Sequence, residues 1–253
     1  MTRPVTDIQR VADLIASGVS QAETARRTGI PRATLREWVK LGLEEAIERR
    51  RERPAQSSGA CDPCGHIARV PHAAYSYLLG QYLGDGSIAS HPRGVYRLRI
   101  ALCLKYPGII TECEQAMTAV LPNRICRVMN IGCLEMASYS KHWPCLFPQH
   151  GPGLKHNRRI VLKGWQERIV LDEQPGMLLR GLVHSDGCRV LNWVNGTAYP
   201  RYHFSNRSDD IRAIFAEACR RLGIACRPNN RWNLSVARRD SVAKLDKFVG
   251  PKA

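Results

Sequence analysis

The sequence predicts an α+β protein in which a small all-α domain precedes a larger domain of two α-β-β-α-β-β-α halves related by a pseudo-twofold axis. Apolar residues recur at helical spacing through the first part of the chain, and the rest contains one decapeptide twice. Each copy is followed by strand and helix patterns in the same order. We therefore expect domains at 1–47 and 74–253, joined by a linker at 48–73, with halves at about 74–150 and 174–253.

The chain carries a strong positive charge. Its 38 Lys and Arg residues against 22 Asp and Glu residues give a formal net charge of +16 at pH 7. Such an excess favours a polyanionic partner, because each neutralised phosphate releases condensed counterions, although a basic protein without such a partner is the alternative. No apolar stretch approaches the roughly 20 residues that span a bilayer, and the N-terminus has no signal-peptide pattern. We expect a cytoplasmic, nucleoid-associated protein of bacterial type whose cysteines are mostly reduced.

The first domain is expected to contain three helices. Thr6 can cap the first helix, whose apolar residues recur at helical spacing. Ser20 can cap the second helix as part of a capping box, and that helix ends before Gly29. Pro31 suits the first turn of a third helix, Arg32 to Lys40, because the N–H that proline lacks has no helical partner there.

Residues 18–38 resemble the helix-turn-helix of resolvases and transposases, in which two short helices flank a turn that contains glycine. The resemblance implies that the third helix enters the major groove of DNA and that its side chains reach base edges. The implied DNA-binding residues are Arg32, Thr34 and Arg36. The alternative is an ordinary three-helix bundle that contacts another protein.

The composition changes at about residue 48, where charged residues, proline and glycine replace the apolar periodicity and predict a linker. The segment contains Cys61-Asp-Pro-Cys64-Gly-His66, a spacing that can present two thiolates to zinc. A closed zinc site needs four ligands, and no second Cys-x-x-Cys follows. A Zn²⁺ site at Cys61, Cys64 and His66 therefore stands beside the alternative of two unreactive cysteines.

The duplicated decapeptide is the most specific feature of the sequence. Tyr77-Leu-Leu-Gly-Gln-Tyr-Leu-Gly-Asp-Gly86 corresponds to Leu178-Leu-Arg-Gly-Leu-Val-His-Ser-Asp-Gly187. Each copy places small residues four apart on one helix face, so that two helix backbones can approach closely. Each copy ends in an aspartate, Asp85 or Asp186, followed by a glycine that suits a left-handed C-cap. Two carboxylates at helix C-termini repel each other, which favours a divalent cation between them.

These paired decapeptides resemble those of the single-chain LAGLIDADG homing endonucleases, also called the DOD type, and the resemblance covers roughly residues 74–253. It implies that the two helices form a pseudo-twofold interface, that two antiparallel sheets follow the major groove of double-stranded DNA, and that the chain acts as a monomer. It also implies Mg²⁺ as the cofactor, with metal ligands at the carboxylates of Asp85 and Asp186 and the carbonyls of Gly84 and Ser185. The second copy departs from the family, since it has His-Ser where Asp-Ala is usual.

Strands with one basic face are expected in both halves, because polar and apolar residues alternate there. By the family resemblance, these faces contact phosphates and base edges. The implied DNA-binding residues are Arg97, Arg99, Arg201, His203 and Arg207. Lys141 and Arg239 follow the last strand of each half and join the two aspartates as catalytic candidates that would stabilise transition-state charge. A solvated basic turn explains these two residues equally well.

Two functions are compatible with these features. The first is a hydrolase, a site-specific endonuclease that cleaves both DNA strands with Mg²⁺ and gains affinity from the tethered helix-turn-helix. The second is a transcriptional regulator with a catalytically silent LAGLIDADG domain, which the atypical second decapeptide favours. The retention of both aspartates favours the nuclease. Residues 140–160, rich in Pro, Gly and His, match no catalytic motif and are expected to form an ordered loop or a second metal site.

Overall fold

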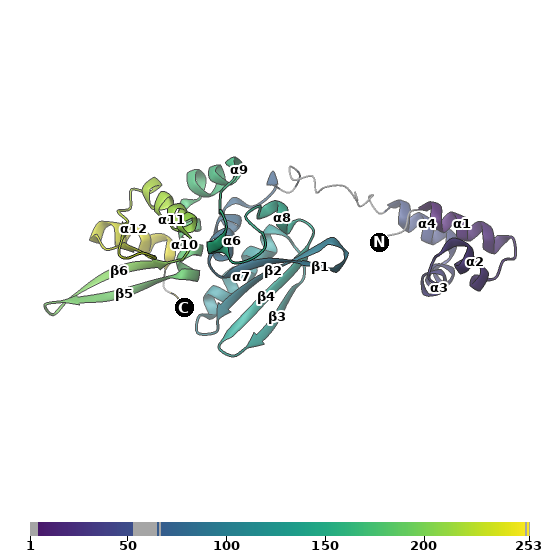
Figure 1. The fold of residues 1–253 in the computed structure, drawn as a ribbon, viewed down its shortest axis with the longest axis horizontal. Helices are drawn as coiled ribbons and strands as arrows, with labels where there is room; N and C mark the ends of the chain where they lie inside the picture. The colour runs from purple at the N-terminus through teal and green to yellow at the C-terminus, as the bar shows by residue number, and fades with distance from the viewer. Residues whose placement is uncertain (1–4, 53–64, 66, 251, 253) are drawn as a thin grey trace. The chain divides into compact units, whose positions relative to one another are not determined.

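The computed structural model describes residues 5–52, 65, 67–250 and 252. The chain divides into two compact units, Met1–Ala60 and Cys61–Ala253 (Figure 1). No helix in the described part of the chain has the length and apolarity needed to cross a membrane. The expected zinc ligands Cys61, Cys64 and His66 lie outside the described residues.

The described part of the first unit is helical, with α1 (Val5–Ala16), α2 (Gln21–Thr28), α3 (Arg32–Leu41) and α4 (Leu43–Glu52). Its buried core consists of Val11, Ile30 and Leu35. The Ser20 hydroxyl accepts a hydrogen bond from the Glu23 N–H at 3.3 Å, so the expected N-cap of the second helix is present. Gly29 ends α2 in the left-handed region, with φ of +66°.

Three details of this unit differ from the expectation. Helix α1 includes Thr6 and begins at Val5, and Pro31 is the N-cap residue of α3 instead of a residue of its first turn. Helix α4 continues past residue 47 to Glu52. Its charged sequence suggested a linker, but Leu, Ala, Glu and Arg are strong helix formers and Ala46 is buried.

The second unit repeats one arrangement of helices and strands twice. The first half consists of α6 (His72–Asp85), β1 (Gly86–His91), β2 (Val95–Cys103), α7 (Pro107–Val120), β3 (Ile125–Asn130), β4 (Cys133–Ser140) and α8 (Trp143–Leu146), with the 3₁₀ turn η1 (Pro92–Gly94) between β1 and β2. The second half consists of α10 (Pro175–Asp186), β5 (Gly187–Val194), β6 (Thr197–Ser205), α11 (Asp209–Arg221), β7 (Arg227–Pro228), β8 (Asn233–Val236) and α12 (Arg239–Val249). The predicted order of elements is confirmed.

The halves are joined by η2 (Lys155–Asn157), α9 (Gly164–Glu167) and η3 (Arg168–Glu173), which includes a π-helical turn. Each half forms a four-stranded antiparallel sheet, in the order β1-β2-β4-β3 or β5-β6-β8-β7, with the helices on one face (Figure 1). One hydrophobic core extends through both halves. The duplicated sequence therefore folds as one domain.

The strand register separates the two faces of each sheet. In β2, Leu98 and Ile100 point into the core, so the alternating residues Arg97 and Arg99 lie on the outer face, away from the helices. In β6, Tyr202 and Phe204 are buried, and their neighbours lie on the outer face. Both sheets thus present an outer face with basic residues, as expected.

Helices α6 and α10 pack directly against each other at the centre of the domain. A Cβ atom at Gly80 would lie 2.7 Å from the Leu178 carbonyl oxygen, and one at Gly181 would lie 2.2 Å from the Tyr77 carbonyl oxygen. Only glycine fits at such a backbone-to-backbone approach. The small residues of the decapeptides therefore act as the sequence predicted.

The glycines that follow the two aspartates have a different role from the expected left-handed cap. Gly86 has φ −91° and Gly187 has φ −110°, both extended, and each begins a strand directly after the helix. A Cβ atom at Gly86 would lie 2.5 Å from Tyr82 Cα, and one at Gly187 would lie 2.7 Å from Val183 Cα. Glycine is required here because the chain turns tightly against the preceding helix.

Candidate active site

Asp85 and Asp186 are the last residues of the two central helices. A Cβ atom at Gly84 would lie 3.2 Å from the carboxyl carbon of Asp186, so this carboxyl group lies beside the end of the partner helix. The pKa of Asp85 is raised to about 6, first by partial loss of hydration and then by the negative charge of Asp186. The Asp85 side chain nevertheless remains accessible to solvent. Loss of hydration also raises the pKa of the half-buried Asp186. The fold thus brings the two acidic groups together.

Lys155 supplies a positive charge to this pair. Its Nζ donates hydrogen bonds to the carbonyl oxygens of Tyr82 at 2.6 Å, Gly84 at 2.5 Å and Gly86 at 2.9 Å. Loss of hydration lowers the pKa of Lys155 to about 8, while the charges of Asp186 and Asp85 oppose this shift. The lysine therefore caps the C-terminal end of α6 and occupies the Gly84 carbonyl that the sequence assigned to a metal ion.

Lys252 takes the corresponding place in the second half. Its Nζ donates to the carbonyl oxygen of Gly187 at 2.5 Å, as that of Lys155 does to Gly86. Loss of hydration lowers the pKa of Lys252, and nearby negative charges, including the two aspartates, oppose the shift. A pseudo-symmetric pair of lysines therefore accompanies the pair of carboxylates.

Neither lysine belongs to a motif that marks it in the sequence. Lys155 lies in the segment 140–160, which was expected to form an ordered loop or a second metal site, and Lys252 lies near the end of the chain. They follow their partner glycines by 69 and 65 residues. This similar spacing becomes a signal only when the two halves are aligned beyond their last strands.

The strand register places Lys141 at another level of its sheet from Gly86. Lys141 is exposed and follows Ser140, which pairs with Tyr96, whereas Gly86 pairs with Ile100. Four residues of strand β2, about 13 Å, separate these two levels of the sheet. Arg239 is exposed in the first turn of α12.

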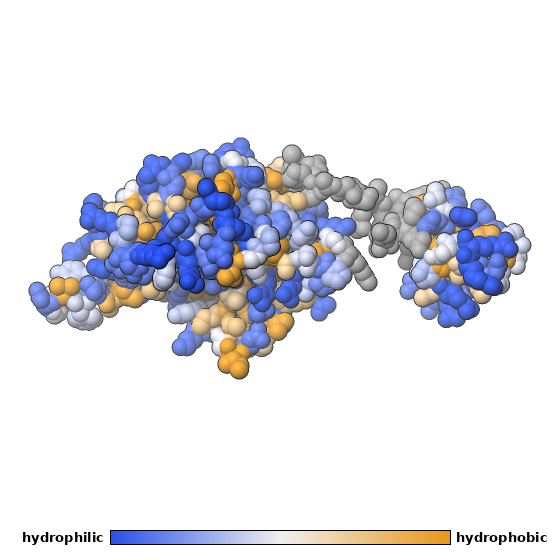
Figure 2. Space-filling model, viewed as in Figure 1, coloured by the Kyte–Doolittle hydropathy of each residue, from blue (hydrophilic) through white to orange (hydrophobic). Residues whose placement is uncertain are grey.

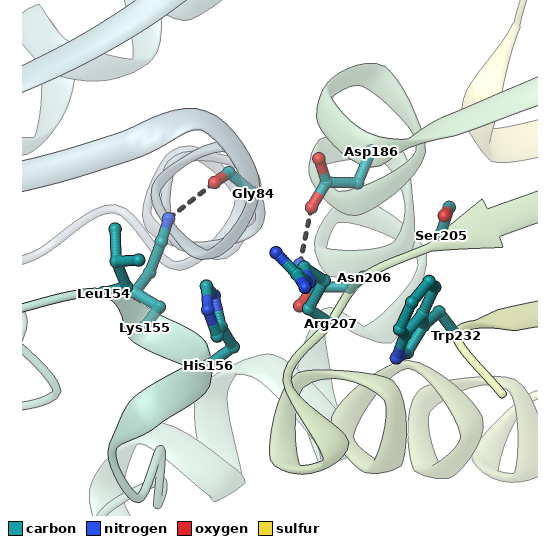
Figure 3. Close-up of a pocket in the computed structure, with 9 residues that line it drawn as sticks. All are labelled: Gly84, Leu154, Lys155, His156, Asp186, Ser205, Asn206, Arg207 and Trp232. Carbon is teal, nitrogen blue, oxygen red and sulfur yellow. Dashed lines mark hydrogen bonds between the residues drawn. The ribbon is translucent and has the colours of Figure 1, made fainter.

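Asn206 holds the second carboxylate. Its Nδ2 donates to Asp186 Oδ2 at 2.6 Å, and its Oδ1 accepts from the Ser208 N–H at 2.8 Å. A cavity of about 310 Å³ opens here, with Lys155 on one side and Asp186 and Asn206 on the other (Figure 3). A phosphate group is small enough to enter a cavity of this size.

His184 stands where the second decapeptide departs from the family pattern, and it is buried. Its Nε2 lies 3.0 Å from the Val249 carbonyl oxygen and its Nδ1 lies 3.2 Å from the Tyr77 hydroxyl. Burial, together with the charge of Arg180, lowers the pKa of His184 to about 4, so the ring is neutral at pH 7. This histidine ties α10 to the end of α12 and to α6, which is a structural role.

The outer faces of the sheets carry the basic residues expected from the sequence. Arg99 forms an ion pair with Glu135 at 3.0 Å. The Nε atom of Arg201 is buried and has no hydrogen-bond partner among the described residues. Loss of hydration lowers the pKa of the neighbouring His203, as does the charge of Arg201.

The visible surface of the second unit is mostly hydrophilic, with apolar atoms at the tip of the β3–β4 hairpin (Figure 2). Met129 and Ile131 are exposed at this tip.

In the first unit, Arg32 and Arg36 are exposed on α3, and Thr34 is half-buried. The three residues assigned to major-groove contact therefore differ in accessibility.

No protein-family model and no curated protein matches the chain. Solved structures of LAGLIDADG proteins are similar to it. I-DmoI in complex with DNA and Mn gives a TM-score of 0.49 and 16% identity over 72% of this chain and 99% of its own. The homing endonuclease I-WcaI bound to its DNA recognition sequence gives 0.47 and 11%, over 79% and 92%. The N-terminal LAGLIDADG domain of DUF199/WhiA gives 0.45 and 10%, over 76% and 90%.

Proposed function

We propose that this chain is a site-specific endonuclease that binds duplex DNA along its two sheets and cleaves both strands with Mg²⁺. The observation that carries the proposal is the pairing of Asp85 and Asp186 at the centre of the domain, where each helix end delivers one carboxylate. Their raised pKa values indicate that the protein does not fully compensate their negative charge. A duplicated decapeptide that ends in the same acidic residue supports a shared role for the two.

Mg²⁺ prefers oxygen ligands and is usually held by one or two carboxylates together with phosphate and water. Asp85 and Asp186 fit this preference, and no cluster of three or more His, Cys, Asp or Glu residues suited to a metal occurs in the described part of the chain. The carbonyl of Gly84, which already accepts a hydrogen bond from Lys155, is a further candidate ligand. The carbonyl of Ser185 is the corresponding candidate in the second half. The bound ion would activate water and stabilise the leaving 3′-oxygen.

Lys155 and Lys252 would act on the DNA backbone itself. Each holds a partly desolvated ammonium group near the carboxylates, where a positive charge attracts a phosphate strongly. Their positive charges would stabilise the negative charge that develops on the phosphate oxygens, and Lys155 would do so while its N–H groups remain on the backbone carbonyls. Lys141 and Arg239 remain the candidates from sequence for the same role, at more exposed positions.

The DNA would lie along the outer faces of both sheets, with contacts from Arg97 and Arg99 in one half and from Arg201, His203 and Arg207 in the other. Helix α3 of the first unit would enter the major groove as the second helix of a helix-turn-helix, with Arg32, Thr34 and Arg36 toward the bases. One chain supplies both halves, so we infer that it acts as a monomer.

A second function, regulation of transcription without cleavage, is favoured by one observation. Lys155 already satisfies the Gly84 carbonyl, and Asn206 already donates to Asp186, so the site is electrostatically supported without a metal ion. In this case the same surfaces would bind DNA and the carboxylates would be inert.

The deciding experiment starts with selection of bound duplexes from a random library by the full chain. Mg²⁺ is then added, and both strands are followed by denaturing electrophoresis. We expect cleavage of both strands by the wild type, and none by Asp85→Asn or Asp186→Asn although both still bind DNA. Asp172→Asn, which changes an exposed carboxylate paired with Arg221, serves as the control and should cleave normally. Binding without any metal-dependent cut by the wild type would decide for the regulator.

A further inference from the structure

Trp232, which immediately precedes β8, holds two arginine side chains against its ring. The guanidinium carbons of Arg207 and Arg231 lie 5.4 Å and 5.6 Å from the ring centroid. A guanidinium that stacks on an indole uses its flat face, so its N–H edge remains available for an anion. The indole is 43% exposed, so the ring lies at the surface.

The two positive charges have no counterion in the described part of the protein. Neither Arg207 nor Arg231 forms an ion pair with a carboxylate there, in contrast to Arg220 and Arg221, which pair with Glu217. Two like charges held at one ring repel each other. A bound anion would relieve this repulsion, so the arrangement favours an anionic ligand.

The backbone around the ring is held in place. The Trp232 N–H donates to Asn230 Oδ1 at 3.0 Å, and its carbonyl oxygen accepts from the Asn206 N–H at 3.0 Å. Asn206 is also the residue whose side chain holds Asp186 at 2.6 Å. A single asparagine therefore connects the tryptophan to the candidate catalytic carboxylate and fixes their relative positions.

The first half has nothing equivalent. In the two halves, Gly86 and Gly187 pair with Ile100 and Phe204, which pair in turn with Met136 and Leu234. In the second half, Asn206 and Arg207 lie two and three residues after Phe204. Trp232 and Arg231 lie two and three residues before Leu234. The corresponding residues of the first half are Leu102, Cys103, Cys133 and Leu134, all uncharged. The pseudo-twofold symmetry is thus broken beside the active site.

We propose that Arg207, Trp232 and Arg231 form a clamp for one backbone phosphate of duplex DNA, next to the phosphate that faces Asp186. The proposal rests on the DNA binding proposed above and adds a polarity to it. The half-site bound by β5–β8 is gripped at this phosphate, and the half-site bound by β1–β4 is not. The clamp therefore makes the grip on the DNA backbone unequal between the two half-sites.

The dependence of binding on salt tests the clamp without a need for cleavage. Each neutralised phosphate contributes about 0.9 to the slope of log K against log salt concentration. We expect the double variant Arg207→Gln/Arg231→Gln to have a slope that is shallower by about one. It should also bind roughly tenfold more weakly at low salt. Arg220→Gln/Arg221→Gln removes the same charge from α11, where Glu217 pairs with both arginines, and should change the slope by less than half as much. Thermal denaturation of each variant verifies folding.

Trp232→Leu tests the ring separately, because it introduces the residue type found at the equivalent position of the first half. The two arginine charges remain, but the indole ring no longer holds the side chains in place. We therefore expect a several-fold loss of affinity for DNA. Replacement of single phosphates of a selected target by neutral methylphosphonates should then reveal one phosphate, on one strand, that matters to the wild type and not to the double variant.

Two results would overturn the clamp: equal slopes for the two double variants, or matching phosphate effects on both strands. A wild-type chain that binds no DNA would instead refute the proposed function, and the clamp with it.

Discussion

The ammonium nitrogen of Lys155 lies 2.5 Å from the carbonyl oxygen of Gly84 and thus occupies a backbone oxygen that the family resemblance assigns to a metal ion. The same nitrogen also binds the carbonyls of Tyr82 and Gly86, which satisfies its three N–H groups. The carbonyl oxygen has a second lone pair, but the ammonium charge would repel a metal ion bound there. The lysine therefore supplies the positive charge at the end of α6 when no metal is bound.

Lys155→Met should tighten the binding of Mn²⁺ to the DNA-free protein. The substitution frees the Gly84 carbonyl and removes a neighbouring positive charge, which is worth on the order of 1–4 kcal/mol near a protein surface. We expect affinity to rise by at least about tenfold, measured from the signal of free Mn²⁺ in electron paramagnetic resonance titrations. Lys244→Met, which removes an exposed lysine bound to the Gly223 carbonyl, should leave affinity unchanged. Unchanged affinity in Lys155→Met would mean that the lysine and the metal do not compete.

The same lysine should be needed for cleavage. Because Lys155 and Lys252 lie near both carboxylates, Lys155→Met and Lys252→Met should each lower the single-turnover cleavage rate by about a hundredfold or more. Lys141→Met and Arg239→Met alter more exposed residues and should lower it by less than about tenfold. The opposite order of effects would restore the assignment made from the sequence.

The pKa of Asp85 predicts how stability depends on pH in the presence of a chelator. The folded protein has a pKa of about 6 at this group and the unfolded chain has one near 3.8. Between these values the folded state binds a proton that the unfolded chain has lost, so the free energy of unfolding should fall as pH rises from about 4 to about 6.

Asp85→Asn removes this titration and should flatten the profile measured by urea denaturation. Because Asp85 is accessible to solvent, the change should be modest. A profile with the same slope in the wild type and in Asp85→Asn would show that other groups control stability in this range.

Gly80→Ala should destabilise the second unit by about 1–3 kcal/mol or more, because its new methyl group would lie 2.7 Å from backbone atoms of Leu178 and Leu182. The two central helices would have to separate. Gly164→Ala is the matched control, since a Cβ atom there meets nothing within 4 Å, and it should change stability by less than about 0.5 kcal/mol. Equal denaturation midpoints for the two variants would contradict the close approach of α6 and α10.

The fold of the second unit could be predicted from its sequence because the signal occurs twice. One decapeptide with small residues at i and i+4 is ambiguous, but two copies followed by the same pattern specify a paired-helix centre. The faces of β2 and β6 follow from strict alternation, as at Leu98 and Arg99. The expected linker begins inside helix α4 because the charge of this segment is typical of a linker, whereas its residues are strong helix formers and Ala46 is buried.

The carboxylates of the site could be predicted, but the residues around them could not. Lys155 and Lys252 reach the helix ends from segments without periodic structure, so no local pattern marks them. Asn206 and Trp232 meet through strand pairing between distant parts of the chain. Gly86 was assigned a left-handed conformation because Asp-Gly is typical of helix ends, whereas the tight entry into β1 requires an extended glycine.

A crystal structure of the full chain on a selected duplex, grown with Ca²⁺ in place of Mg²⁺, tests the central claim most directly. We predict DNA along the outer faces of both sheets, with Ca²⁺ within about 2.3–2.6 Å of carboxylate oxygens of Asp85 and Asp186 and a backbone phosphate beside each. DNA held by the first unit alone, or lying on a surface away from these two aspartates, would contradict the account.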